Sequence, residues 1–118
     1  MTAAIHRKNP IVSDLIEQYP DFLELITYFI ENLPLMIIEI QELQREGDWD
    51  LLKGKIHDLK SVGGNYGYMQ ITDICNQIEG AIRLNQLKRV SSLISELAML
   101  SIRICDGLDV VIDKAKSL

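Results

Sequence analysis

The sequence predicts an all-α protein: an antiparallel up-and-down four-helix bundle with a short extra helix at its N-terminal end. Apolar residues recur at intervals of three and four along most of the chain, whereas almost nothing alternates with the period of two typical of a strand. Four long amphipathic segments are joined by short connections, which force neighbouring helices to run antiparallel. A chain of 118 residues, of which 47% are hydrophobic, suits one domain with one core.

The first two helices are expected on either side of a Tyr-Pro pair. A short helix is predicted over residues 11–18, ending at Tyr19 because the residue before a proline avoids helical geometry. Asp21 is expected to cap the second helix, which extends to about residue 45. Pro34 lies inside this helix and should kink it or start a new turn there. The apolar stripe of the second helix consists of Phe22, Leu25, Ile26, Phe29, Ile30, Leu33, Met36, Ile37 and Ile40.

The later helices are separated by glycine-rich or polar connections. Gly47 should end the second helix, and Asp48 should cap the next. A heptad coiled coil fits less well than a bundle, because Pro34 and the glycine-rich turn interrupt any long seam. The expected boundaries are a helix over residues 49–66, a break at residues 67–70, a helix whose apolar face runs from Ile71 to Ile82, a connection at residues 84–86 and a last helix over residues 87–114.

Composition limits the function classes. We expect a single domain over residues 1–118 with a flexible start at residues 1–10, and we assign no role to His6 within it. A net charge of −5 argues against nucleic acid as a partner. The apolar run LPLMII is too short to span a membrane and no secretory signal is visible, so we expect a cytoplasmic protein. Cys75 and Cys105 lack metal-site spacing and are expected to be reduced core thiols.

One histidine, His57, is predicted to face water. The core stripe of its helix is formed by Trp49, Leu52, Ile56, Leu59 and Gly63, and at about 100° per residue His57 lies roughly 120° from the centre of this stripe. The residues that share its face are three small ones and two cations. They are Gly54, Ser61, Gly64, Lys53 and Lys60.

The small residues on this face predict a docking surface. Each glycine inside a helix costs about 1 kcal/mol relative to alanine, so three of them need a reason. Gly63 points toward the core and would allow close helix packing. Gly54 and Gly64 are expected to point outward, where a partner backbone pressing close to His57 would explain them, together with Ser61.

The chemistry that suits this face is phosphate carriage. A neutral exposed imidazole is a good nucleophile near neutral pH, and Lys60 and Lys53 would partly neutralise a phosphoryl group on it. No residue three or four positions from His57 is a metal ligand, so no metal site is expected. Ser61 lacks an orienting third group, and the segment Gly47–Lys55 lacks the spacing of a phosphate loop. We therefore expect a carrier and not a self-contained enzyme.

The stretch HDLKSVGGNYGY resembles the signature of the histidine-containing phosphotransfer (HPt) domain. Ser61 departs from the pattern at a position where glycine is usual. The resemblance extends from about residue 22 to residue 108, through ENLP, GDW and ICNQIE. The matching residues of the central motif are His57, Leu59, Lys60, Gly64 and Gly67.

The resemblance implies a function and a partner. His57 would accept a phosphoryl group from an aspartyl phosphate on a receiver domain and pass it to another receiver. The chain would have no kinase or ATPase activity and no cofactor of its own, because the receiver brings the Mg²⁺. The expected partners are receiver domains of response regulators or of hybrid sensor histidine kinases, with neither nucleic acid nor membrane, and the chain is expected to be a monomer.

Three further residues enter through the resemblance. Glu79 occupies the position at which the family often places glutamine beside the phosphohistidine, and an acidic group there would repel phosphate unless it pairs with Lys60 or turns away. Phe29 and Leu33 are expected to extend the receiver platform, with plain core packing as the alternative. The alternative function is a helical interaction module that binds a receiver or another partner without accepting phosphate.

Overall fold

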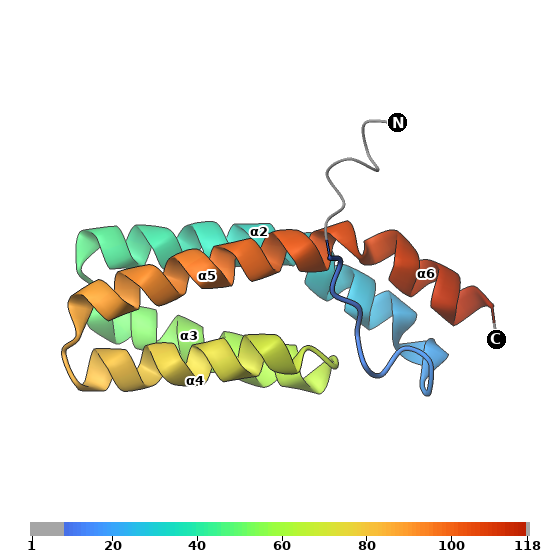
Figure 1. Cartoon of the computed structure of the whole chain (residues 1–118), viewed down its shortest axis with the longest axis horizontal. Coiled ribbons are helices and arrows are strands. Elements are labelled where there is room, and N and C mark those ends of the chain that lie inside the picture. The colour runs from blue at the N-terminus through green and yellow to red at the C-terminus, as the bar shows by residue number, and fades with distance from the viewer. Residues whose placement is uncertain (1–8, 118) are drawn as a thin grey trace.

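The computed structural model describes residues 9–117 and is helical with no strand within them (Figure 1). The prediction of a flexible start and the histidine at position 6 concern mainly residues 1–8, which lie outside the described residues. The helical elements are the 3-10 helix η1 (Pro20–Phe22) and the α-helices α2 (Leu23–Glu46), α3 (Trp49–Asn65), α4 (Met69–Arg83), α5 (Leu87–Asp106) and α6 (Leu108–Lys116).

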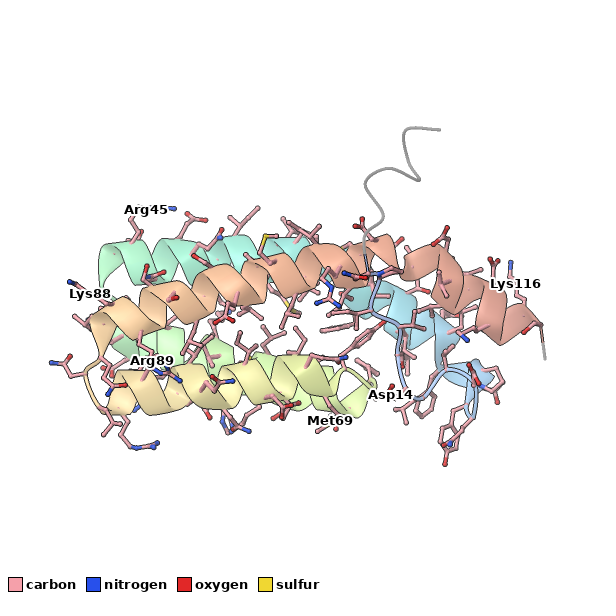
Figure 2. The ribbon with its side chains drawn as sticks, viewed as in Figure 1. Asp14, Arg45, Met69, Lys88, Arg89 and Lys116 are labelled. Carbon is pink, nitrogen blue, oxygen red and sulfur yellow. The ribbon has the colours of Figure 1, made fainter. Side chains whose placement is uncertain are left out.

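Helices α2 to α5 form the predicted antiparallel bundle. Each of these helices packs against two others, so that α2 and α4 lie diagonally opposite each other and contact both α3 and α5. Figure 2 shows side chains filling the space between the helices, whereas charged side chains such as Arg45 and Lys88 point outward. The interior is almost wholly apolar, as the predicted stripes require. Its largest fully buried side chains include Tyr68, Phe29, Ile26, Ile30, Leu33, Ile40, Leu52, Ile56, Ile71 and Ile78.

The two turns that enclose the helix bearing His57 follow the predicted chemistry. Gly47 ends α2 with φ of 73°, a left-handed conformation that glycine adopts at little cost. Asp48 then caps α3 by accepting a hydrogen bond from the backbone N–H of Leu51 at 3.3 Å. At the far end, Gly67 has φ of 87° and starts the turn into α4.

Pro34 lies within α2 without ending the helix. Figure 1 shows the first turns of α2 (blue) sloping away from the rest of the helix (teal). Proline has no N–H, so the carbonyl of Ile30, four residues earlier, loses its helical donor. The thiol of Cys105 on α5 reaches this carbonyl at 3.8 Å, which gives that half-buried cysteine a structural contact.

The predicted helix over residues 11–18 is not formed. This segment makes turns, and its hydrogen-bonding groups are used by distant parts of the chain: Ile11 N–H donates to the Arg103 carbonyl and Asp14 N–H to the Gly67 carbonyl. The Ser13 hydroxyl accepts a hydrogen bond from the backbone N–H of Leu15. Because these groups have tertiary partners, they are not available for helical hydrogen bonds.

Two other boundaries differ from the prediction. The expected cap at Asp21 is wrong, because that residue lies inside η1 and α2 begins after Phe22 without a side-chain cap. The predicted last helix is broken at Gly107 into α5 and α6. A side chain at Gly107 would meet the carbonyl oxygen of Ile11 at 2.5 Å, so the N-terminal segment lies directly against the break.

Within residues 9–117, no helix combines the length and apolar character needed to cross a membrane.

Candidate functional site

His57 stands on the outer face of α3. Its side chain is 63% exposed, while the core positions of the same helix, including Ile56 and Leu59, are buried on the opposite side. The structure thus places the imidazole where helical geometry predicted it. The only hydrogen-bonding contact of the ring among the described residues is at Nδ1, so Nε2 has no hydrogen-bond partner among them.

Glu79 of α4 connects His57 to Lys60. Its Oε2 lies 3.2 Å from His57 Nδ1, and its Oε1 lies 2.7 Å from the Lys60 ammonium. The carboxylate therefore bridges the ring and the cation, with one oxygen to each. The Glu79 side chain is 22% exposed and that of Lys60 is 24% exposed, so water screens this network only in part.

The charge state of Glu79 follows from these contacts. Burial raises the pKa of its carboxyl, but the hydrogen bonds and charges of Lys60 and His57 outweigh burial, and the pKa of Glu79 is lowered from its usual value. The group is therefore an ionised acceptor at neutral pH. The family resemblance placed Glu79 near His57, and the structure shows the pairing with Lys60 that was one of the two alternatives for an acidic group there.

The three glycines of α3 have three different surroundings. A Cβ added at Gly63 would lie 2.6 Å from Ile71 Cγ2, so this glycine allows close packing of α3 on α4, as predicted. A Cβ at Gly64 would lie 2.8 Å from the Thr72 hydroxyl oxygen, which corrects the expectation that packing within the domain cannot explain Gly64. A Cβ at Gly54 would meet nothing within 4 Å, and this residue is exposed.

The other predicted residues of the face are exposed or partly exposed. Ser61 is exposed on the same face as His57, and its hydroxyl donates to the His57 carbonyl at 3.3 Å. Lys53, one turn before His57, is exposed. Lys60 is held by Glu79, so it is not a free cation beside the ring. Lys53, Gly54, Lys60 and Ser61 together provide a shallow, polar surface around the imidazole. The space beside Gly54 is open.

The expected contribution of Phe29 and Leu33 to the docking surface is wrong. Phe29 is 2% exposed and Leu33 is fully buried, because both point from α2 into the core. The large apolar side chains that α2 exposes are Leu25 at 52%, Tyr28 at 68%, Leu35 at 67% and Ile38 at 51%. Tyr28, Leu35 and Ile38 lie off the predicted apolar stripe of α2, whereas Leu25 was predicted to belong to it and is not part of the core.

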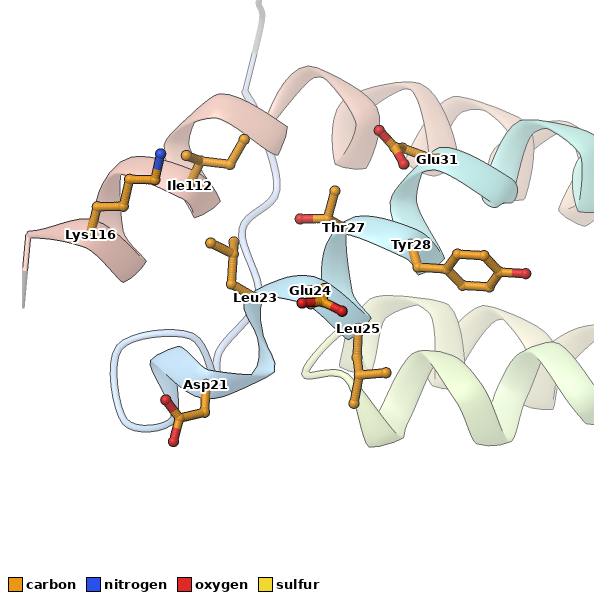
Figure 3. A pocket seen from close by; sticks show the side chains of 9 residues that line it. All are labelled: Asp21, Leu23, Glu24, Leu25, Thr27, Tyr28, Glu31, Ile112 and Lys116. Carbon is orange, nitrogen blue, oxygen red and sulfur yellow. The ribbon is translucent and has the colours of Figure 1, made fainter.

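Surface hollows border α2, one of them beside α3 and another beside α6. A small groove between α2 and α3 is lined in part by Met36, Leu59 and Val62, next to the ion pair of Lys55 with Glu39 at 3.2 Å. A wider hollow lies at the other end, between the first turns of α2 and helix α6 (Figure 3). No member of the network around His57 lines either hollow.

No group of three or more histidine, cysteine, aspartate or glutamate side chains within residues 9–117 is arranged to hold a metal ion. Cys75 is buried, and burial raises the pKa of its thiol to about 12, which keeps the group neutral and unreactive.

The site is thus an exposed histidine, paired with a carboxylate, on the outer face of an antiparallel helical bundle. The family model of the Hpt domain matches residues 24–111, which is most of the chain. The chain therefore belongs to the Hpt domain family. Domains of this family are phosphocarriers and not enzymes, act as phosphotransfer modules in phosphorelays, and typically interact with receiver domains. Comparisons with curated proteins and with solved structures gave no match.

Proposed function

We propose that His57 is the phosphoacceptor of this domain and that it relays a phosphoryl group between aspartates of two receiver domains. The receiver supplies Mg²⁺ and the acidic pocket that holds the phosphoryl group, and this chain supplies the nucleophile and the surface against which the receiver docks. Phosphoryl transfer needs mainly positioning and charge neutralisation, so a histidine on a docking face suffices.

One observation carries the proposal: the imidazole of His57 is exposed, with its Nδ1 beside a carboxylate and no hydrogen-bond partner for Nε2 among the described residues. A phosphorylated aspartate can therefore approach Nε2 without breaking a hydrogen bond of that atom to the described residues. The His57 side chain is also exposed and is not part of the apolar core, so its modification does not require the bundle to open.

The exposed residues around His57 define the proposed docking surface. Gly54 and Ser61 flank the ring at the level of one helical turn and present little bulk to a partner. Lys53 lies on the same face and is exposed, so it is the cation that is free to approach an incoming phosphoryl group. Lys60 reaches that group only by loosening its contact with Glu79.

The experiment is phosphoryl transfer from a phosphorylated receiver domain with Mg²⁺. The wild-type protein should gain an acid-labile label, and His57→Gln should gain none while keeping its helical circular dichroism. His6→Gln is the matched control, because it removes the other histidine of the chain and should leave labelling intact. Label on the His57→Gln variant would reject the assignment.

A second candidate is an interaction module that binds a receiver without accepting phosphate. The negative charge of Glu79, 3.2 Å from the imidazole, favours it, because that charge repels an anion at the ring. The His57→Gln variant separates the two candidates. If the protein is an interaction module, the variant should bind the receiver as tightly as the wild type does, and neither the variant nor the wild type should take label.

A further inference from the structure

We propose that the outer face of α2 is a docking surface for a basic amphipathic helix of a partner protein, separate from the surface around His57. This face carries a line of exposed side chains, the α2 seam, whose spacing alternates between four and three residues. Side chains spaced in this way lie in one line along a helix, and the same spacing forms the contact line of paired helices. The members of the α2 seam are Glu24, Tyr28, Glu31, Leu35, Ile38 and Glu42.

The middle of the α2 seam is largely apolar. Tyr28 is 68% exposed, Leu35 is 67% exposed and Ile38 is 51% exposed. Single exposed apolar side chains are ordinary on a protein surface, but three large ones in line along one helix form a patch that binding would remove from water. Helix α2 is continuous from Leu23 to Glu46, so the α2 seam extends along one helix for about 27 Å. That length fits a partner helix of about five turns.

The chain covers the other sides of α2 and leaves hollows along the α2 seam. Helices α3, α5, α6 and η1 are the elements that contact α2. Tyr28 lines both the wide hollow beside α6 and a further hollow formed by α2 residues alone, which includes Leu35 and Ile38 (Figure 3). The two hollows therefore meet at an exposed aromatic side chain, and such side chains are the common anchors of protein interfaces.

The charges of the α2 seam identify the chemistry of its occupant. Glu24, Glu31 and Glu42 are exposed, and none of them forms an ion pair or a side-chain hydrogen bond among the described residues. No lysine or arginine belongs to the seam. The complement of this surface is a helix with apolar side chains between lysine or arginine residues. A second copy of this chain fits less well, because pairing two such seams brings carboxylates against carboxylates whether the helices run parallel or antiparallel.

The α2 seam and the surface around His57 lie on different sides of the bundle. His57 contacts Glu79, so its ring lies on the side of α3 that faces α4. Helix α2 meets the opposite side of α3, where Lys55 pairs with Glu39. The α2 seam lies further round, on the side of α2 that points away from the core. A helix bound there leaves the imidazole accessible, so the domain can hold this partner and a receiver at the same time.

The test uses a fluorescein-labelled helical peptide of three heptads, with apolar residues at positions a and d and lysine at positions e and g. Fluorescence anisotropy should show binding with a Kd on the order of micromolar that weakens as salt is added. Leu35→Gln/Ile38→Gln should weaken binding about a hundredfold, because the apolar contact is lost. Glu24→Gln/Glu31→Gln/Glu42→Gln should weaken it about tenfold and reduce its dependence on salt.

Two controls isolate the α2 seam. The same peptide with glutamate in place of every lysine should not bind. Met99→Gln/Ile102→Gln is the matched variant, because these side chains of α5 are also more than half exposed and three residues apart, and it should bind the lysine peptide as the wild type does. Circular dichroism should show all variants folded, since each substitution is at an exposed position.

The inference fails if the lysine peptide does not bind, or if the two α2 variants bind it as the wild type does. It also fails if sedimentation equilibrium shows a wild-type dimer that Leu35→Gln/Ile38→Gln dissociates, because the occupant is then a second copy. Labelling of His57 from a phosphorylated receiver should be as fast in Leu35→Gln/Ile38→Gln as in the wild type. Slower labelling would place the α2 seam in the receiver surface and overturn the claim of a separate site. A wild-type protein that binds the peptide but never takes label would reject only the proposed function.

Discussion

At the scale of single residues, the site depends on one carboxylate with two partners. Glu79 accepts from Lys60 at 2.7 Å and lies 3.2 Å from the His57 ring, and it is ionised because these contacts outweigh its partial burial. Helical periodicity placed His57 and Lys60 on one face of their helix, and the family resemblance placed Glu79 beside them. The sequence could not decide whether Glu79 would pair with Lys60 or turn away, because that depends on how closely α3 and α4 approach.

Removing the Lys60 charge should raise the pKa of Glu79. In Lys60→Met the strongest interaction that lowers this pKa is lost and burial, which raises it, remains. The titration of the Glu79 carboxyl carbon by ¹³C NMR measures the change. Lys55→Met is the control, since that lysine of α3 pairs with Glu39 and should leave the Glu79 titration unchanged.

The contact between Glu79 and Lys60 makes the stability of the protein depend on pH. The pKa of Glu79 is lower in the folded than in the unfolded protein, so its contribution to stability is present above the unfolded pKa and is lost as pH falls through the folded pKa. The difference in free energy of unfolding between the wild type and Lys60→Met should therefore shrink as the solution is acidified. Urea unfolding at a series of pH values measures this difference in free energy. A difference that grows toward acid pH would contradict the claim that Lys60 lowers the pKa of Glu79.

At the scale of elements, the packing of α3 on α4 explains most of the glycines beside His57. The close approach of Ile71 to Gly63 and of Thr72 to Gly64 brings the two helices near enough for Glu79 to reach the ring. The Thr72 hydroxyl also donates to the Lys60 carbonyl at 3.0 Å, which fixes α4 against the turn that carries Lys60. Periodicity predicted the core role of Gly63, but it assigned Gly64 to a partner because it does not measure distances between helices.

Two alanine substitutions in α3 should have opposite effects on stability. Gly63→Ala places a methyl group 2.6 Å from Ile71 Cγ2, and overpacking of this kind destabilises by about 1–3 kcal/mol. Gly54→Ala meets open space inside a helix and should stabilise by up to about 1 kcal/mol. Thermal and urea unfolding measure both effects.

Gly54→Ala also tests the docking surface. If a receiver presses against this position, the added methyl group should slow labelling from the receiver while the fold gains stability. Gly80→Ala on α4 is a matched control, since the nearest side-chain atom to a Cβ there is 3.7 Å away on Arg83. Unchanged labelling of Gly54→Ala would remove Gly54 from the docking surface.

At the scale of the whole molecule, the N-terminal segment closes one end of the bundle. It joins the α3–α4 turn to the junction of α5 and α6, through the contact of Ser13 with the Tyr66 carbonyl at 2.6 Å and of Ile11 N–H with the Arg103 carbonyl at 3.1 Å. The segment lies close to Gly67, where a side chain would meet Ser13 Oγ at 2.5 Å. Helix α6 packs on η1 and the first part of α2 at the same end.

Ser13→Ala should loosen this closure. Ser13 is buried, and its hydroxyl both donates to the Tyr66 carbonyl and accepts from Leu15 N–H, so the substitution leaves two partly buried backbone groups without these partners. A loss of about 1–3 kcal/mol in the free energy of unfolding is expected. Faster amide hydrogen exchange around residues 11–18 and the α3–α4 turn would locate the effect. Ser92→Ala, at an exposed position of α5, is the control and should change stability by less than about 0.5 kcal/mol.

The sequence by itself determined the class of fold, the four long helices, the turns at Gly47 and Asp48 and the outward direction of His57. These features depend on residues within one or two helical turns of each other, and helical periodicity, capping and glycine chemistry describe such neighbours well. Only the tertiary structure decided that Glu79 bridges His57 and Lys60, that Phe29 and Leu33 are core residues, that residues 11–18 form no helix and that the last helix breaks at Gly107. Each of these depends on contacts between segments far apart in the chain, and such contacts exist only once the helices have packed.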